Sequence, residues 1–112
     1  MKTSTKINFT GCLFLLGAAL CYAAPVTENW EALCMKCHGA DGRGQTKVGK
    51  KLGLKDYTDA KVQAEMNDEH MTKVIAEGVM GKSGKEQMKA YAPDLTPDEV
   101  KDLVAYIRKF KA

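Results

Sequence analysis

Cysteine and histidine are scarce in this sequence, which limits the metal and disulfide sites that it can build. The 112 residues include four cysteines and two histidines. Cys12 and Cys21 fall in an apolar N-terminal stretch, so that Cys34 and Cys37 are the pair left to the rest of the chain. Two cysteines three positions apart make a poor disulfide staple. A structural zinc site needs a second pair of ligands, and beyond the histidine beside this cysteine pair only His70 remains.

The sequence also lacks a strong excess of charge of either sign. Its 17 Lys and Arg residues exceed its 14 Asp and Glu residues by three. Lys2 and Lys6 belong to the N-terminal stretch, and without them the counts are 15 and 14, a formal charge of +1. A nearly neutral domain has no electrostatic basis for binding nucleic acid, so we expect no nucleic-acid partner.

Long hydrophobic runs are absent as well. The apolar run at residues 9–20 is well short of the roughly 20 apolar residues that a membrane-spanning helix needs. It is preceded by two lysines and followed by small residues, which is the layout of a secretory signal. A retained membrane anchor is the alternative. We expect a signal peptide at residues 1–23, cleavage after Ala23, no stable membrane insertion, and one exported, periplasmic domain over residues 24–112.

No segment alternates convincingly between apolar and polar residues, and this predicts an all-α fold. Helix start signals, by contrast, are clear, and the last is the strongest, because Thr96, Pro97 and Glu99 combine a cap, a proline at the first helical position and a capping box. The expected loop at residues 40–56 is long for a compact domain unless it wraps around something. The expected helices are residues 27–37 with Thr27 as cap, 60–66 after Asp59, 68–77 between Asn67 and Gly78, and a last helix from Pro97, with loops at residues 40–56 and 78–93.

The pair Cys34 and Cys37 is followed at once by His38, in the motif CMKCH. On the last turn of a helix these three side chains leave from neighbouring positions on one side. That spacing suits covalent attachment of haem, in which the two thiols add to the vinyl groups as thioethers and the imidazole ligates the iron. A dithiol redox site of the thioredoxin type would need a βαβ context, which the chain does not offer. We therefore predict one covalently bound haem c with its iron.

Over nearly all of residues 24–112 the chain resembles class I c-type cytochromes, and within them it is similar to small bacterial cytochromes of the c6 and c5 kind. The motifs that carry the resemblance are CMKCH, the aromatic Trp30 four residues before the first cysteine, GADGRG after the site, MKAYAPDLT before the final helix and YIRKF at its end. The resemblance implies a fold whose first and last helices cross over the haem. Trp30 would then pack against a stripe that includes Val100, Leu103 and Tyr106.

The sixth ligand of the iron is the least determined site residue. Met35 lies between the cysteines, and Met66 and Met71 fall in helical stretches, which leaves Met80 and Met88 in the loop before the last helix. The resemblance of MKAYAPDLT to the methionine segment of the family favours Met88 as the ligand, with Met80 as the second choice.

The sequence departs from the family at two places that bear on the iron ligands. Many members have a proline in the loop after the haem site whose carbonyl accepts the N–H of the proximal histidine. Residues 47–58 contain no proline, so the acceptor for His38 is open. Met88 is followed by Lys89 where the family usually has proline. Ligation by His70 in place of a methionine, which would give a bis-histidine iron, is the remaining alternative.

The resemblance implies an electron carrier and not an enzyme, because histidine and methionine together leave no open position on the iron. Its partners would be redox proteins such as an oxidase, a reductase or a dehydrogenase. The two loops are basic, which suits an acidic docking surface on the partner, although plain solvated charge is the simpler explanation. The rival function is a haem protein with an open or labile sixth position that acts as a gas sensor or peroxidase. The loop lysines are Lys47, Lys50, Lys51, Lys55, Lys82, Lys85 and Lys89.

Overall fold

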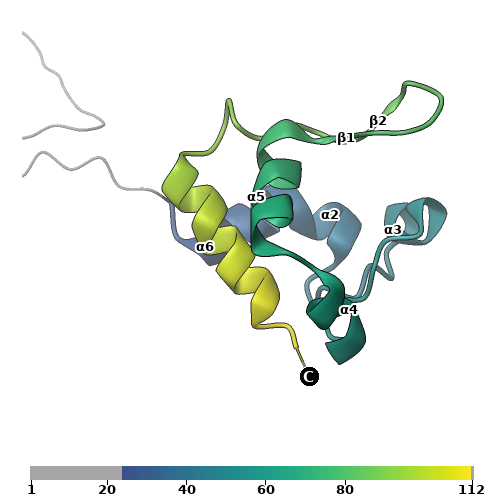
Figure 1. Ribbon diagram of the computed structural model, residues 1–112, viewed down its shortest axis with the longest axis horizontal. Helices are drawn as coiled ribbons and strands as arrows, with labels where there is room; N and C mark the ends of the chain where they lie inside the picture. Colours follow the sequence, from purple (N-terminus) through teal and green to yellow (C-terminus); the bar gives the residue numbers. More distant parts are fainter. Residues whose placement is uncertain (1–23, 112) are drawn as a thin grey trace, which may run out of the picture.

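The computed structural model describes residues 24–111 as a small set of packed helices with one short hairpin (Figure 1). The expected all-α fold is confirmed in its helices, and the hairpin is an addition to it. The expected signal peptide, residues 1–23, lies outside the described residues. Within residues 24–111, none of the helices has both the length and the apolar character needed to cross a membrane.

The described chain starts with one helical run made of three segments: α1 (Val26–Asn29), a π-helical turn η2 (Trp30–Cys34) and α2 (Met35–His38). Pro25 stands immediately before α1 with φ −54°, so the prediction that Thr27 caps this helix is wrong. Proline suits this place because its fixed φ is close to helical and its missing N–H would find no partner in the first turn. Thr27 lies inside the helix instead.

A short helix, α3 (Lys47–Leu52), lies within the stretch that the sequence predicts as an extended loop, residues 40–56. The Thr46 side chain caps it by accepting a hydrogen bond from the Gly49 N–H at 2.8 Å. Gly53 ends it with φ 67°. The loop prediction is wrong for these six residues, because a helix of under two turns presents too few apolar side chains for a periodic pattern.

Two further helices, α4 (Ala60–Glu65) and α5 (Asp68–Glu77), occupy the stretches predicted for them. The side chains of Asp59 and Asn67 cap these helices by accepting hydrogen bonds from first-turn N–H groups at 2.8 Å and 3.0 Å. The predicted end of α5 at Gly78 is also confirmed. Local capping chemistry is enough to fix both helices in sequence.

A two-stranded antiparallel hairpin follows, made of β1 (Val79–Met80) and β2 (Glu86–Met88). Val79 is opposite Met88 in its register. The prediction of a loop over residues 78–93 is therefore incomplete. Most of the hairpin side chains are exposed, so no face of it carries the alternating apolar pattern that reveals a strand.

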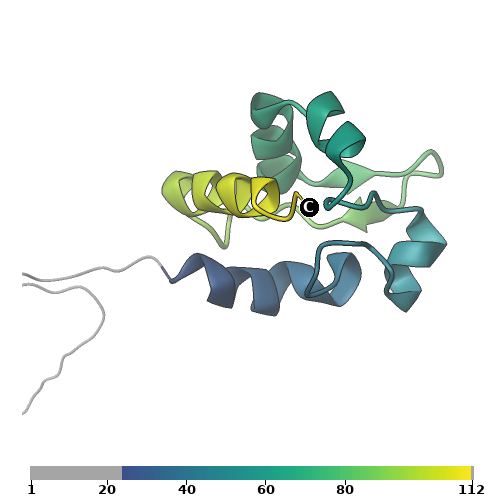
Figure 2. The ribbon, with the colours of Figure 1, turned by 90° about the horizontal axis from the view of Figure 1, so that it is seen from below.

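The last helix, α6 (Pro97–Arg108), begins with the predicted capping box. The Glu99 N–H donates to the Thr96 hydroxyl at 3.1 Å, and the Thr96 N–H donates to the Glu99 carboxylate at 2.9 Å. α6 packs on α1 and on α5. Figure 2 shows α6 between the first helical run on one side and α5 on the other.

The hydrophobic core lies where these helices meet. Trp30 and Leu103 are its most buried side chains, at 2% and 1% exposure. The Trp30 ring lies 5.4 Å from the Tyr106 ring, which confirms the expected packing of the first helix on the last. The buried members of the core are Trp30, Met71, Ile75, Leu95, Val100, Leu103, Val104 and Ile107.

Candidate functional site

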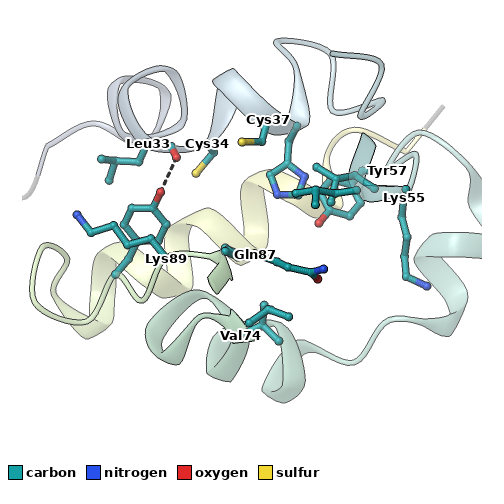
Figure 3. Close-up of a pocket in the computed structure, with 15 residues that line it drawn as sticks. Leu33, Cys34, Cys37, Lys55, Tyr57, Val74, Gln87 and Lys89 are labelled. Atoms are coloured by element: carbon teal, nitrogen blue, oxygen red, sulfur yellow. Dashed lines mark hydrogen bonds between the residues drawn. The ribbon is translucent and has the colours of Figure 1, made fainter. Parts of the chain in front are cut away.

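One side of the first helical run faces a cavity of about 410 Å³. Figure 3 shows the cysteine-bearing helix along one side of this cavity and residues of α5 and β2 along the other. The stretch around α3 contributes further lining residues. An apolar cavity with few polar groups suits a hydrophobic ligand. The apolar lining residues include Leu33, Leu52, Leu54, Val74, Val79 and Met88.

The two cysteine thiols point into the cavity from one wall (Figure 3). Cys34 is the last residue of η2 and Cys37 lies three residues on in α2, so both side chains leave the helix on the same side. Neither cysteine forms a disulfide. Burial and the neighbouring Cys37 raise the pKa of Cys34 to about 11. The Cys34 side chain is therefore a neutral thiol at pH 7.

His38 follows Cys37 on the same wall and lines the cavity, half-buried. Burial lowers the pKa of His38 below its ordinary value, which keeps the imidazole neutral at pH 7. A histidine must be neutral to ligate a metal. Its Nδ1 atom is buried and has no hydrogen-bond partner among residues 24–111. Residues 24–111 therefore supply no acceptor for the ring N–H of His38, which is the contact that the sequence leaves open.

Two aromatic rings contact the His38 imidazole. The Tyr57 ring stacks on it at 5.3 Å between centroids with an interplanar angle of 20°. The Trp30 ring lies 5.9 Å away and is tilted by 40°. Sequence reasoning placed Trp30 in the core but missed Tyr57, because Tyr57 is far along the chain from CMKCH. The available signal was the unusual length of the first loop, which does wrap the cavity through Leu52 and Leu54.

The structure separates the three residues considered as the sixth ligand. Met88 is half-buried, lines the cavity and packs against the hydrophobic core. Met80 is 63% exposed at the end of β1 and is not among the residues that line the cavity. His70 is exposed on α5 and also lies outside the lining. Cys34, Cys37, His38 and Met88 are therefore gathered around one cavity, while Met80 and His70 are not.

The chain around Met88 is held on both sides although no proline follows it. Met88 pairs with Val79 in the hairpin. After it, the Tyr91 N–H donates to the Ile75 carbonyl at 3.0 Å, and the Tyr91 hydroxyl donates to the Leu33 carbonyl at 2.9 Å (Figure 3). The second bond ties the methionine segment to the turn just before Cys34. Tyr91 belongs to the motif MKAYAPDLT, but nothing in the sequence indicates its contact across the cavity.

The loop lysines are not equivalent. Lys89 forms an ion pair with Asp94 at 3.0 Å and lies 5.6 Å from the centre of the Tyr91 ring. Its charge is therefore compensated within the loop. Within residues 24–111, the remaining loop lysines form no ion pair. They are Lys47, Lys50, Lys51, Lys55, Lys82 and Lys85.

The residues around the cavity fit a covalently attached haem. Two thiols, a neutral imidazole and a thioether meet an apolar space, and each has a place in haem attachment or iron ligation. A structural zinc site does not fit as well, because residues 24–111 contain no cluster of three or more His, Cys, Asp or Glu side chains able to hold a metal ion.

Comparison with known proteins gives a consistent result. The cytochrome c family matches residues 23–111 of the chain. Among solved structures, KustC0563 c-type cytochrome is 36% identical, with a TM-score of 0.66 over 77% of this chain and 96% of that chain. A tyrosine-to-phenylalanine mutant of Kustc0563 is also 36% identical, with a TM-score of 0.65 over 77% of this chain and 98% of that chain. None of the curated proteins compared matches the chain.

Proposed function

The chain belongs to the cytochrome c family and is a haem c electron-transfer protein, and from this premise we propose a more specific function. It is a periplasmic shuttle that carries single electrons between redox proteins. His38 and Met88 are the two axial ligands of its iron, and Cys34 and Cys37 form the thioether bonds.

The chain's own residues prepare the site for this role. When bound, the haem supplies reversible one-electron chemistry at its iron. His38 is kept neutral by burial and so has a lone pair to donate. The apolar side chains that line the cavity keep water away, which is one of the means by which a protein sets a reduction potential.

The position of Met88 is the observation that carries this proposal. Met88 lies between Gln87 and Lys89, which Figure 3 places across the cavity from Cys34 and Cys37. The Met88 thioether would approach the iron from the side of the cavity opposite the wall that bears His38. With a protein ligand on each side, the iron has no open position for a substrate. The arrangement therefore supports electron transfer and not catalysis.

Two features support the remaining parts of the proposal. The secretory layout of residues 1–23 supports export to the periplasm. The unpaired lysines of the α3 region and the hairpin support docking to an acidic surface on the redox partner, because exposed charges of opposite sign steer encounter.

The ligand assignment is tested with Met88→Ala, Met80→Ala and His70→Ala, each read by the weak near-infrared band that arises from sulfur-to-iron charge transfer in the oxidised protein. We expect the band in the parent protein, its loss in Met88→Ala, and its retention in the other two. The reduced Met88→Ala protein should also bind carbon monoxide rapidly, whereas the parent should not.

Other outcomes each point to a different ligand. Loss of the band in Met80→Ala alone would assign the ligand to Met80. If the parent protein lacks the band but is low-spin, His70 becomes the favoured sixth ligand. A high-spin parent that binds carbon monoxide rapidly would favour the gas sensor or peroxidase.

A further inference from the structure

We propose that Trp30 and Tyr57 are positioning residues that set the orientation of the His38 imidazole by ring contact, in place of the usual hydrogen bond. The inference rests on the proposed ligation of the iron by His38. It concerns the direction of the imidazole plane, which is a separate property from the identity of the opposite ligand.

The His38 side chain lacks a hydrogen-bond acceptor within the described residues. A metal-ligating histidine almost always donates its other ring N–H to a carboxylate, carbonyl or water, and that bond fixes the ring orientation. The buried Nδ1 of His38 has no such partner within residues 24–111. Three backbone carbonyls of the haem-attachment segment accept from donors other than His38: that of Cys37 from the Thr46 hydroxyl at 2.6 Å, that of His38 from the Gly44 N–H at 2.8 Å and that of Gly39 from the Trp30 indole N–H at 3.1 Å.

Contacts with two aromatic rings supply the missing restraint on the imidazole. Tyr57 lies nearly parallel to the imidazole, at 5.3 Å and 20°. Trp30 reaches it from the hydrophobic core, at 5.9 Å and 40°. Rotation of the imidazole about its bond to Cβ would break the stacked contact with Tyr57 and move the ring edge against one of the two neighbours. Aromatic pairs favour defined geometries of this kind.

The rings of Trp30 and Tyr57 are themselves held in place by their surroundings. The Trp30 side chain is 2% exposed, and its ring is packed by Phe110 at 5.0 Å. The Tyr57 side chain is half-buried and packed against the hydrophobic core. Its backbone is held as well, because its N–H donates to the Gly42 carbonyl at 2.9 Å and its carbonyl accepts from the Gln63 side chain at 2.7 Å. Rings with so little freedom can hold a third ring in place.

The test compares Tyr57→Leu, which removes the stacked ring, with Tyr57→Phe, which keeps the ring and removes the hydroxyl. The control is Tyr106→Leu, because Tyr106 contacts Trp30 at 5.4 Å but forms no ring pair with His38. The readout is the proton NMR spectrum of the oxidised protein, in which the hyperfine shifts of the haem methyl groups report the direction of the axial ligand planes. Thermal unfolding is measured in parallel.

We expect Tyr57→Leu to change the spread and order of the methyl shifts, and Tyr57→Phe to keep those of the parent. Tyr106→Leu should lower the unfolding temperature and leave the methyl shifts in place. If Tyr57→Leu does not incorporate haem, Tyr57→Met serves in its place. Unchanged methyl shifts in the variant that lacks the ring, or equal changes in Tyr106→Leu, would overturn the inference. The near-infrared band is recorded for every variant, so that failure of Met88 ligation is recognised separately.

Discussion

Gly78 is a residue on which the position of Met88 depends directly. It ends α5 with φ 78°, a conformation that favours glycine. A Cβ atom at this place would lie 2.5 Å from the Met88 carbonyl oxygen and 2.8 Å from the Ala90 nitrogen. Both are backbone atoms, which cannot turn aside as a flexible side chain does. The methionine segment passes where it does because this residue has no side chain.

We expect Gly78→Ala to displace the methionine segment and to weaken the near-infrared band of the oxidised protein. Gly84→Ala is the matched control, because Gly84 has φ 81° in the same hairpin region but open space around its Cβ position. The positive φ should cost each variant about 1 to 2 kcal/mol of unfolding free energy, and the contacts of the new Cβ with backbone atoms should add to that cost in Gly78→Ala. The band should be weaker in Gly78→Ala alone. Equal bands in both variants would show that Met88 does not depend on this close approach.

The sequence is informative about single residues where the chemistry is local. Cys34, Cys37 and His38 stand together in one motif, and the structure gathers all three on one wall of the cavity. Gly78 was predicted as a helix end, but its contact with the methionine segment depends on a backbone that returns ten residues later. The ring contact of Tyr57 with His38 depends in the same way on the path of a loop. Such contacts have no signature in a single sequence.

Glu99 links the first and last helices at the level of whole elements. It lies in the first turn of α6 and is 8% exposed. Besides its bond to Thr96, its carboxylate accepts hydrogen bonds from the Asn29 side chain at 3.0 Å and from the Ala24 N–H at 3.1 Å. The bonds from the Thr96 backbone and from Asn29 hold the pKa of Glu99 below its ordinary value.

This lowered pKa predicts how stability depends on pH. The Glu99 carboxylate binds a proton less readily in the native state than in the unfolded state. Its contribution to stability is therefore complete well above the ordinary pKa of about 4.3, and it is lost as the pH falls through the lower pKa of the native state. We expect the unfolding free energy of the parent to exceed that of Glu99→Gln by about 2 kcal/mol at pH 7, because the substitution removes hydrogen bonds to a charged group. That difference should shrink on acidification towards pH 3.

Urea unfolding at pH 7 and pH 3 measures this difference. Glu31→Gln is the control, because Glu31 is exposed and accepts no side-chain hydrogen bond within the described part of the chain. It should change stability little at either pH. A parent-to-Glu99→Gln difference that is the same at both pH values would mean that charge is not the source of the stabilisation.

Elements with local end signals were predictable, and elements without them were not. α5 and α6 carry capping side chains and clear apolar faces, and both begin where the sequence predicts. α3 has a cap at Thr46 but only six residues, too few for a periodic pattern. The β1–β2 hairpin is formed by pairing between exposed strands, and this pairing leaves no hydrophobic pattern.

At the scale of the whole molecule, six of the lysines that form no ion pair within residues 24–111 lie in two segments that contain no acidic residue, 47–55 and 81–85. Figure 1 shows α3 and the hairpin on the same side of the molecule, with α6 on the other. Lys82 and Lys85 lie in the turn between β1 and β2, and both are exposed. Composition predicted the near neutrality but not this separation, nor the pairing of Lys89 with Asp94.

We expect Lys82→Gln and Lys85→Gln each to slow oxidation of the reduced protein by ferricyanide, roughly two- to fivefold at low salt, because an anionic oxidant is steered by positive charge near its encounter site. Lys101→Gln on α6 has the same charge change on the other side and should have a smaller effect. The difference should vanish as salt rises, since exposed charges are screened over about 10 Å at 0.1 M.

A cationic cobalt(III) phenanthroline complex is an oxidant of opposite charge. Removal of the same lysines should accelerate oxidation of the reduced protein by this complex. Equal rates for all three variants and the parent with ferricyanide at low salt would leave the hairpin lysines as solvated charge only. Absorption spectra of the variants should match the parent throughout, which separates changes in encounter from changes at the iron.

The contact between the two ends of the domain has a consequence for the order of synthesis. Asn29 and Glu99, which are 70 positions apart, share a buried hydrogen bond beside Trp30. A ribosome adds about 5 to 20 residues per second, so roughly 4 to 14 s pass before the partner of Asn29 exists. During that interval the indole has no last helix to cover it, and the fold cannot close. The topology itself thus keeps the nascent chain open while it is being made, and the export that we propose for this protein requires an open chain.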